Sequence, residues 1–384
     1  MVTLMMQKVF RERFQRLNFV LFSAVLAVGV TACGGGNNAG DDQTTNGDQQ
    51  QQQQDLFSQD MSMTGAGASF PAPLYQNWFI ELNKKHPQLQ VNYQSIGSGA
   101  GVEQFMSQTV NFGASDVAMT DEQMANVDRG VLLLPMTAGS IVLTYNLPGV
   151  ESGLKLTRDA YTDILLGNIT TWNDPAIAET NPEVELPDQP ITVVHRSDGS
   201  GTTGVFTKHL TTISEDWTKE IGEGKSVQWP KDKGTFVGGK GNEGVTAQVK
   251  QTPGAIGYVE YGYAVNNDLA MASLENASGN FIEPNNETAS ATLAAVELPE
   301  NLRAFITDPE GENSYPIVTY TWMMAYEEYD PQEAKAMEVM IEYGLNEGQE
   351  IAPQLGYVAL PQTVRERVAK TADVISPDYT ITVK

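Results

Sequence analysis

The chain has 384 residues, a formal net charge of −25 and a single cysteine. So acidic a protein does not suit the phosphate backbone of nucleic acids, and we exclude nucleic acid as a partner. One cysteine cannot form an intramolecular disulfide, and none of the three histidines lies in a recognisable cluster with cysteine or carboxylates, so we expect no metal and no cofactor.

Residues 1–32 have the features of a secretory signal peptide. Basic residues precede an apolar stretch from Leu17 to Ala32, which is short for a bilayer-spanning helix. Cys33 follows small residues, a pattern that resembles a bacterial lipobox, in which the cysteine is lipidated and becomes the mature N-terminus. An ordinary signal peptide that ends near a cysteine is the alternative. We expect a protein of the periplasm or cell envelope, anchored by lipid at Cys33.

Residues 33–62 are rich in Gly, Asn, Asp and Gln and lack the apolar content for a core, which predicts a disordered tether. The remaining residues are numerous enough for two lobes. Strand-like runs at 131–134 and 141–145 alternate with helical patterns, which indicates the α/β class. The acidic segment 268–313 is poorly periodic and is predicted to be loop-rich.

Two small-residue turns follow in the chain. The first, TGAGASFPAP from Thr64, precedes a helical pattern formed by Leu74, Trp78 and Leu82. The second, IGSGAG at 96–101, follows an alternating strand and opens another helical pattern. Helix starts carry unpaired backbone N–H groups that suit an anion. A glycine-rich turn alone is more often only a turn.

Asp116 ends the next apolar run, and Thr120 to Gln123 offer a capping box for a following helix. In isolation Asp116 could be a solvated loop residue. Beside an anion site, a carboxylate suits a ligand that still carries a proton, because two buried acceptors facing each other are costly. Phosphate near neutral pH keeps a proton and sulfate does not, so Asp116 would reject sulfate.

The stretch from His195 to Thr203 places Arg196 before a run of glycine and hydroxyl residues, between a strand and a helix. Arg196 supplies a planar fork of donors, and the helix start supplies N–H groups. This arrangement predicts an oxyanion site, with an ordinary capped loop as the alternative.

These motifs, with GGKGNEGV from Gly238 and PGAIGYVEYGYA from Pro253, resemble those of the periplasmic phosphate-binding protein family, the substrate-binding component of ABC-type phosphate transporters. The resemblance runs from about Met63 to the end. It implies a two-lobed periplasmic-binding-protein fold (type II-like), with the ligand cleft between α/β lobes. Lobe 1 would take 63–137 and 318–384, and lobe 2 would take 138–317.

The resemblance also implies which residues contact phosphate: Ser69, Phe70, Ser98, Asp116, Arg196, Ser200, Gly201 and Thr202. Asp198 would orient Arg196 rather than touch the ligand. Ser69 stands where the best-known members have threonine, and Gly99-Ala100-Gly101 replaces a Ser-Gly-Gly run. Both changes affect fine affinity rather than the class of ligand.

The expected function is to bind inorganic phosphate and deliver it, as a monomer, to the permease subunits of an ABC importer with a cytoplasmic ATPase. We expect no enzyme and no catalytic residue, because Ile96 breaks the G-x-S-x-G pattern around Ser98. The alternatives are a secreted phosphate-ester hydrolase and a surface scavenging or adhesion lipoprotein with the same fold. Binding of another tetrahedral anion is a lesser variant.

Overall fold

The computed structural model of the protein describes residues 56–57 and 59–384. The predicted signal peptide, Cys33 and most of the predicted tether lie outside the described residues. Within the described ranges, no helix combines the length and the apolar character needed to cross a membrane.

A mixed sheet runs through this part of the chain in the strand order β2-β1-β3-β12-β4-β8-β6-β7, with β9 paired to β4. In the first group of strands, β1 pairs in parallel with both β2 and β3, and β12 pairs with β3 in the antiparallel sense. The elements of this group are β1 (Met61–Gly67), α2 (Ala72–Lys85), β2 (Leu89–Ser95), α3 (Ser98–Met106), β3 (Phe112–Ser115), α4 (Asp121–Ala125), β12 (Val318–Ala325), α12 (Pro331–Leu345), α13 (Glu347–Ile351), η1 (Ala352–Leu355) and α14 (Gln362–Ala372).

The second group is built on β6, β7 and β8, which pair in parallel. The strands β5, β10 and β11 form a separate three-stranded sheet. The elements are β5 (Lys155–Leu156), α5 (Arg158–Leu166), α6 (Pro175–Ala178), β6 (Thr192–Arg196), α7 (Gly201–Ile213), α8 (Glu215–Glu220), β7 (Thr235–Gly239), α9 (Gly241–Gln251), β8 (Ala255–Glu260), α10 (Tyr261–Val265), β9 (Ala270–Met271), β10 (Ser273–Glu275), β11 (Phe281–Ile282) and α11 (Asn286–Ala294).

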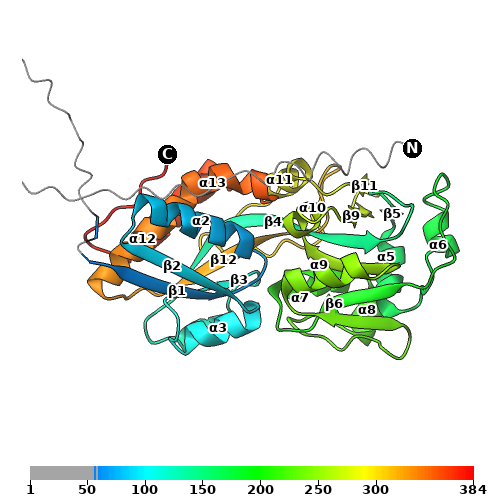
Figure 1. Ribbon diagram of the computed structural model, residues 1–384, viewed down its shortest axis with the longest axis horizontal. Helices are drawn as coiled ribbons and strands as arrows, with labels where there is room; N and C mark the ends of the chain where they lie inside the picture. The colour runs from blue at the N-terminus through cyan, green and yellow to red at the C-terminus, as the bar shows by residue number, and fades with distance from the viewer. Residues whose placement is uncertain (1–55, 58) are drawn as a thin grey trace, which may run out of the picture. The chain divides into compact units, whose positions relative to one another are not determined.

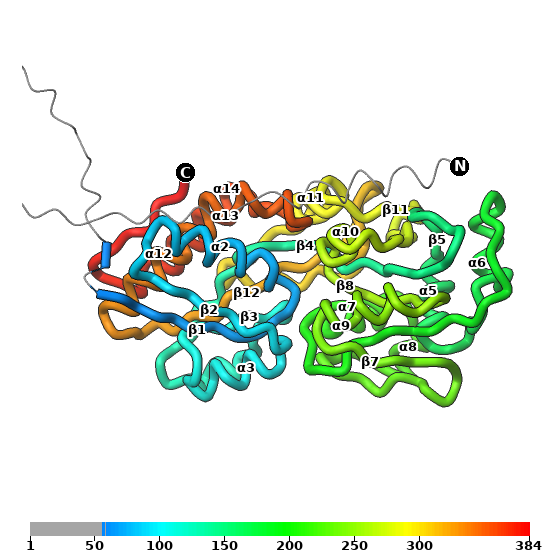
Figure 2. The backbone as a smooth tube through the Cα atoms, in the orientation of Figure 1, coloured from blue at the N-terminus to red at the C-terminus, as the bar shows by residue number. Residues whose placement is uncertain are grey.

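Strand β4 (Leu132–Asn146) belongs to both groups. Its residues up to Ser140 pair with β12, and its residues from Ile141 onward pair with β8. The runs predicted at 131–134 and 141–145 are therefore two parts of one strand. Figure 1 shows β4 and β12 between the two groups of elements. In Figure 2 the chain passes from the first group (blue and cyan) to the second (green and yellow) and returns (orange and red). The expected two-lobed α/β architecture is confirmed.

Local signals in the sequence explain the element boundaries near the cleft. The predicted capping box is present, because the Thr120 side chain accepts from the Gln123 N–H while the Gln123 side chain accepts from the Thr120 N–H. Ser200 caps α7 by accepting from the Thr203 N–H at 3.0 Å. Leu74, Trp78 and Leu82 are buried along α2, as their spacing predicts.

The end of the predicted tether is wrong by several residues. Phe57 is 2% exposed and packs edge-on against His86, and β1 begins at Met61 rather than after residue 62. The physical reason is local apolar content: Leu56 and Phe57 bring hydrophobic surface that packs against the core. The polar composition of residues 33–62 as a whole did not indicate that Leu56 and Phe57 pack against the core.

Removing the Phe57 ring tests this anchor. We expect Phe57→Ala to lower the free energy of unfolding by about 3 kcal/mol, because a buried phenyl group is lost. Urea denaturation measures the change, and Gln59→Ala at a neighbouring exposed position serves as the control. Equal stability of the two variants would contradict the anchoring role.

Candidate functional site

The predicted site residues lie together at the carboxyl ends of strands from both lobes. Ser69 and Phe70 follow β1, Ser98 opens α3 after β2, and Asp116 directly follows β3. From the second lobe, Arg196 ends β6, and Ser200 to Thr202 form the start of α7. All of these residues are buried, and even the long Arg196 side chain is only 5% exposed. Carboxyl ends of strands in such sheets are where ligands bind.

Close contacts join the two sides of this cleft. The Gly99 N–H donates to the Gly199 carbonyl at 2.8 Å, so the start of α3 meets the loop before α7. A Cβ atom at Gly201 would lie 2.4 Å from Ser98 Oγ and 2.8 Å from the Asp116 nitrogen. Only glycine therefore allows the start of α7 to approach the other lobe this closely.

Arg196 is held in place by Asp198. Arg196 Nε and Nη2 donate to the two carboxylate oxygens of Asp198 at 2.8 and 2.5 Å, in the orienting role expected for it. Burial opposes the charge of Arg196, but the hydrogen bonds and charge of Asp198 raise its pKa. Arg196 Nη1 lies 3.4 Å from Thr202 Oγ1, which directs the remaining donors toward the start of α7.

Asp116 is a buried carboxylate with a hydroxyl donor on each oxygen. Oδ1 accepts from Thr321 Oγ1 at 3.0 Å, and Oδ2 accepts from Thr202 Oγ1 at 3.1 Å. Burial raises the pKa of Asp116 to about 6, against these two hydrogen bonds and the positive charges of Arg196 and Lys225. Near neutral pH the group is therefore chiefly ionised and able to accept a proton-bearing ligand group.

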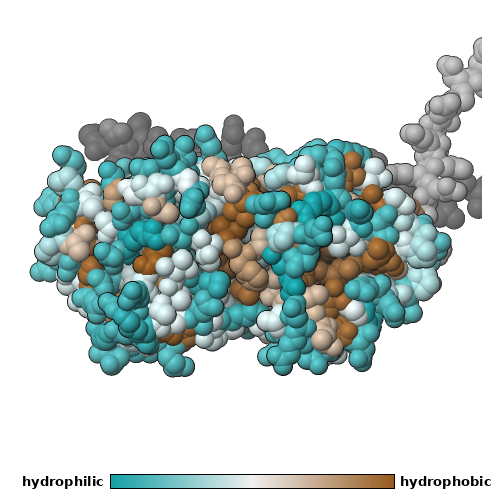
Figure 3. Space-filling model, turned by 180° about the vertical axis from the view of Figure 1, so that it is seen from behind, coloured by the Kyte–Doolittle hydropathy of each residue, from teal (hydrophilic) through white to brown (hydrophobic). Residues whose placement is uncertain are grey.

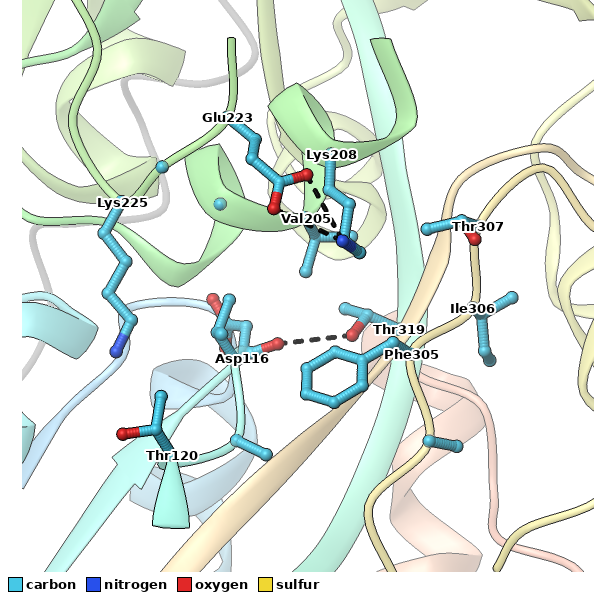
Figure 4. A pocket seen from close by; sticks show the side chains of 15 residues that line it. Asp116, Thr120, Val205, Lys208, Glu223, Lys225, Phe305, Ile306, Thr307 and Thr319 are labelled. Carbon is cyan, nitrogen blue, oxygen red and sulfur yellow. Dashed lines mark hydrogen bonds and ion pairs between the residues drawn. The ribbon is translucent and has the colours of Figure 1, made fainter. Parts of the chain in front are cut away.

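A cavity of about 390 Å³ opens beside Asp116 (Figure 4). Two lysines line it, and they differ in their surroundings. Lys208 is paired with Glu223 at 3.2 Å. Figure 4 shows Lys225 on the side of the cavity where Asp116 and Thr120 lie. Burial lowers the pKa of Lys225, while the charge of Asp116 raises it. The cavity also borders Phe305, which is 55% exposed.

Figure 3 shows the opposite face to Figure 1, largely hydrophilic with apolar residues gathered toward its middle.

Three residues at this site escaped sequence reasoning. Asn242, at the start of α9, contacts Ser69 and Thr202. It lies within the GGKGNEGV motif, in which nothing local indicates that the asparagine faces the cleft. Thr321 lies in the middle of β12, and nothing in its local sequence indicates a site. Lys225 lies in the loop between α8 and β7, where the sequence has no motif or periodicity that indicates a site. Among the described residues, no group of three or more His, Cys, Asp or Glu could hold a metal ion.

Comparison with known proteins identifies the family to which the chain belongs. A family model described as a PBP superfamily domain matches residues 40–344. The chain is 42% identical over 317 residues to the phosphate-binding protein PstS of Pasteurella multocida, covering 82% of this chain and 90% of that protein. It is 43% identical over 312 residues to the protein of the same name from Haemophilus influenzae, covering 80% and 91%. Among solved structures, a high affinity periplasmic phosphate-binding protein bound with phosphate (PfluDING) matches with a TM-score of 0.66 at 21% identity, covering 81% of this chain and 93% of that one.

Two lobes that share strands and bury polar groups between them define a solute-binding protein. The chain belongs to the PBP superfamily and, within it, to the PstS family.

The raised pKa of Asp116 predicts a pH dependence of stability in the unliganded protein. The folded state holds this proton up to about pH 6, whereas the unfolded chain releases it near 3.8. The free energy of unfolding should therefore fall as pH rises through this window and level off above it.

Asp116→Asn should remove that contribution and stabilise the unliganded protein at neutral pH by roughly 1–3 kcal/mol. Urea denaturation at about pH 4 and about pH 7 measures it. Glu260 and Glu338 also have raised pKa values and remain in the variant. Because the charge of Asp116 contributes to raising the pKa of Glu260, the difference from wild type combines the titration of Asp116 with its effect on Glu260. The same pH slope in both proteins would argue against a raised pKa at Asp116.

Proposed function

We propose that this protein binds inorganic phosphate in the cleft between its lobes and delivers it to the permease of an ABC importer. The observation that carries the proposal is the meeting of Arg196, the start of α7 and the buried acceptor Asp116 within one cleft. Of the tetrahedral anions phosphate and sulfate, only phosphate can use donors and an acceptor together, because near neutral pH it retains a proton.

The binding mechanism follows from the residues present. The backbone N–H groups of Phe70, Ser98 and Gly201, at or just before the starts of α2, α3 and α7, would supply donors to the anion. The N–H groups of Ala72 and Gly99 already donate to protein carbonyls. Arg196 adds a charged, planar fork that Asp198 holds in orientation. The hydroxyls of Ser69, Ser98, Ser200 and Thr202 complete the set. These donors come from both lobes, so phosphate favours the closed arrangement by contacts that separated lobes cannot make.

Asp116 supplies selectivity in this mechanism. Its Oδ2 accepts the proton that phosphate carries, in place of the Thr202 hydroxyl. Sulfate lacks that proton and would place a second buried acceptor against the carboxylate, which costs about 1–3 kcal/mol or more.

We extend the proposal to the whole protein. We propose a division into lobes at 63–137 with 318–384 and at 138–317, supported by the change of β4 partners between Ser140 and Ile141. The first lobe is extended to Met61, where β1 begins. We further propose a monomeric, non-enzymatic binding protein of the periplasm or cell envelope, anchored by lipid at Cys33.

Calorimetric titration of the full-length protein, freed of bound ligand by unfolding and refolding, tests the ligand. We expect tight one-to-one binding of phosphate and none of sulfate at equal concentration. Refolded protein that binds neither ion would contradict the proposed function.

Arg196 provides a sharper test of the site. Arg196→Ala should weaken phosphate binding by about 2–5 kcal/mol, because it leaves Asp198 and the ligand charge without their buried partner. Lys219→Gln removes the same charge from an exposed position and serves as the matched control. Titration calorimetry of both variants should show a loss for the first alone. Similar affinities for the two would exclude Arg196 from the site.

Selectivity is expected to depend on Asp116. In Asp116→Asn the ratio of phosphate to sulfate affinity should narrow at least tenfold, since the amide presents a donor where a bare oxyanion needs one. Competition titrations with the two ions measure the ratio. An unchanged ratio would refute the proton-accepting role, even if phosphate still bound.

A further inference from the structure

Asn242 is buried at the start of α9 and makes four polar contacts in the cleft. Its Oδ1 accepts from the Glu260 N–H at 3.0 Å. Its backbone N–H and its Nδ2 both donate to Ser69 Oγ, each at 3.0 Å. Nδ2 also lies 3.4 Å from Thr202 Oγ1. Asn242 thus connects two hydroxyls of the site to the backbone of β8.

The orientation of the Asn242 amide is determined by its neighbours. The Glu260 backbone nitrogen can only donate, so it must face the amide oxygen. The amide nitrogen is then directed to Ser69, where it must donate because it has no lone pair to offer. The reversed amide would set two donors against each other at Glu260.

These contacts dictate where the Ser69 hydrogen points. A hydroxyl has one hydrogen and two acceptor lone pairs. Two N–H groups of Asn242 occupy both lone pairs, so the hydrogen must be donated elsewhere. Ser69 is 1% exposed, and within the described part of the chain no protein acceptor receives this hydrogen. A buried donor without an acceptor is costly, and a bound oxyanion would satisfy it.

We propose that Asn242 is a positioning residue that directs the Ser69 hydroxyl hydrogen toward the bound anion, and that it does so only when the lobes are closed. This inference rests on the proposed function. Ser69 follows β1 in one lobe, while α9 packs against β7 and β8 in the other. Closure of the lobes therefore brings the two N–H donors of Asn242 to the Ser69 hydroxyl in the same state in which the anion can accept the hydroxyl hydrogen. Tyr263 strengthens the same junction by donating its hydroxyl to the Ser69 carbonyl at 2.7 Å.

A double-mutant cycle on phosphate affinity tests this role. Asn242→Ala and Ser69→Ala should each weaken phosphate binding about 10- to 100-fold, as expected for a hydrogen bond to a charged group. If Asn242 acts through Ser69, adding Asn242→Ala to Ser69→Ala should weaken binding less than about threefold further. Ser69→Thr keeps the hydroxyl, so it should retain affinity and full sensitivity to Asn242→Ala.

The outcomes separate this inference from the proposed function. Equal losses from Asn242→Ala with and without the Ser69 hydroxyl would overturn the positioning role while leaving phosphate binding intact. Wild-type protein that fails to bind phosphate would overturn the proposed function itself. Thermal unfolding of each unliganded variant checks folding. If Asn242→Ala does not fold, Asn242→Ser replaces it in the cycle, because its hydroxyl can accept from the Glu260 N–H without adding a charge. Its loss should be smaller in the Ser69→Ala background than with Ser69 present.

Discussion

The arrangement of the cleft depends on keeping one carboxylate, Asp116, charged while it is buried between two lobes. An isolated carboxylate in such a place would be neutralised, and burial does raise the pKa of Asp116. Hydroxyls on both oxygens and the cations Arg196 and Lys225 offset enough of that cost to leave it ionised at neutral pH. Because these partners come from β12, α7, the end of β6 and the loop after α8, the requirement of one group organises elements that are distant in sequence.

The short range of the interactions in the cleft explains how an acidic protein can bind an anion. A net charge of −25 repels phosphate at long range, but salt screens that repulsion beyond about 10 Å. Within the cleft, the relevant groups are a buried arginine, a lysine at the cavity beside Asp116, and the helix starts. Close contact through Gly99, Gly199 and Gly201 brings these donors within reach of one small ion.

Much of this site could be predicted from sequence, because small-residue turns between strands and helices carry recognisable local signals. The turns around Ser69, Ser98 and Arg196 marked candidate anion sites, but which of their residues contact phosphate followed from the resemblance to a known family. Alternating strand and helix patterns predicted the α/β class. What local patterns could not provide was the partner of each group. Thr321 is one hydroxyl within a buried strand, and its role exists only because β12 returns beside β3. Likewise, α11 was missed within a polar segment, and Phe57 was hidden in a predicted tether, because packing rather than composition decides both.

One irregularity in the sheet bears on how the lobes move. The pairing of β12 with β4 shifts register between Thr321 and Trp322, next to the residue that donates to Asp116. Such a bulge leaves a residue unpaired and allows the strand to bend and twist locally. The extra residue is Met136 of β4, and bending of β4 there would change the angle at which the strand leaves the first lobe. The irregularity of the sheet and the hydroxyl that donates to Asp116 therefore face each other across two strands, Met136 in β4 and Thr321 in β12.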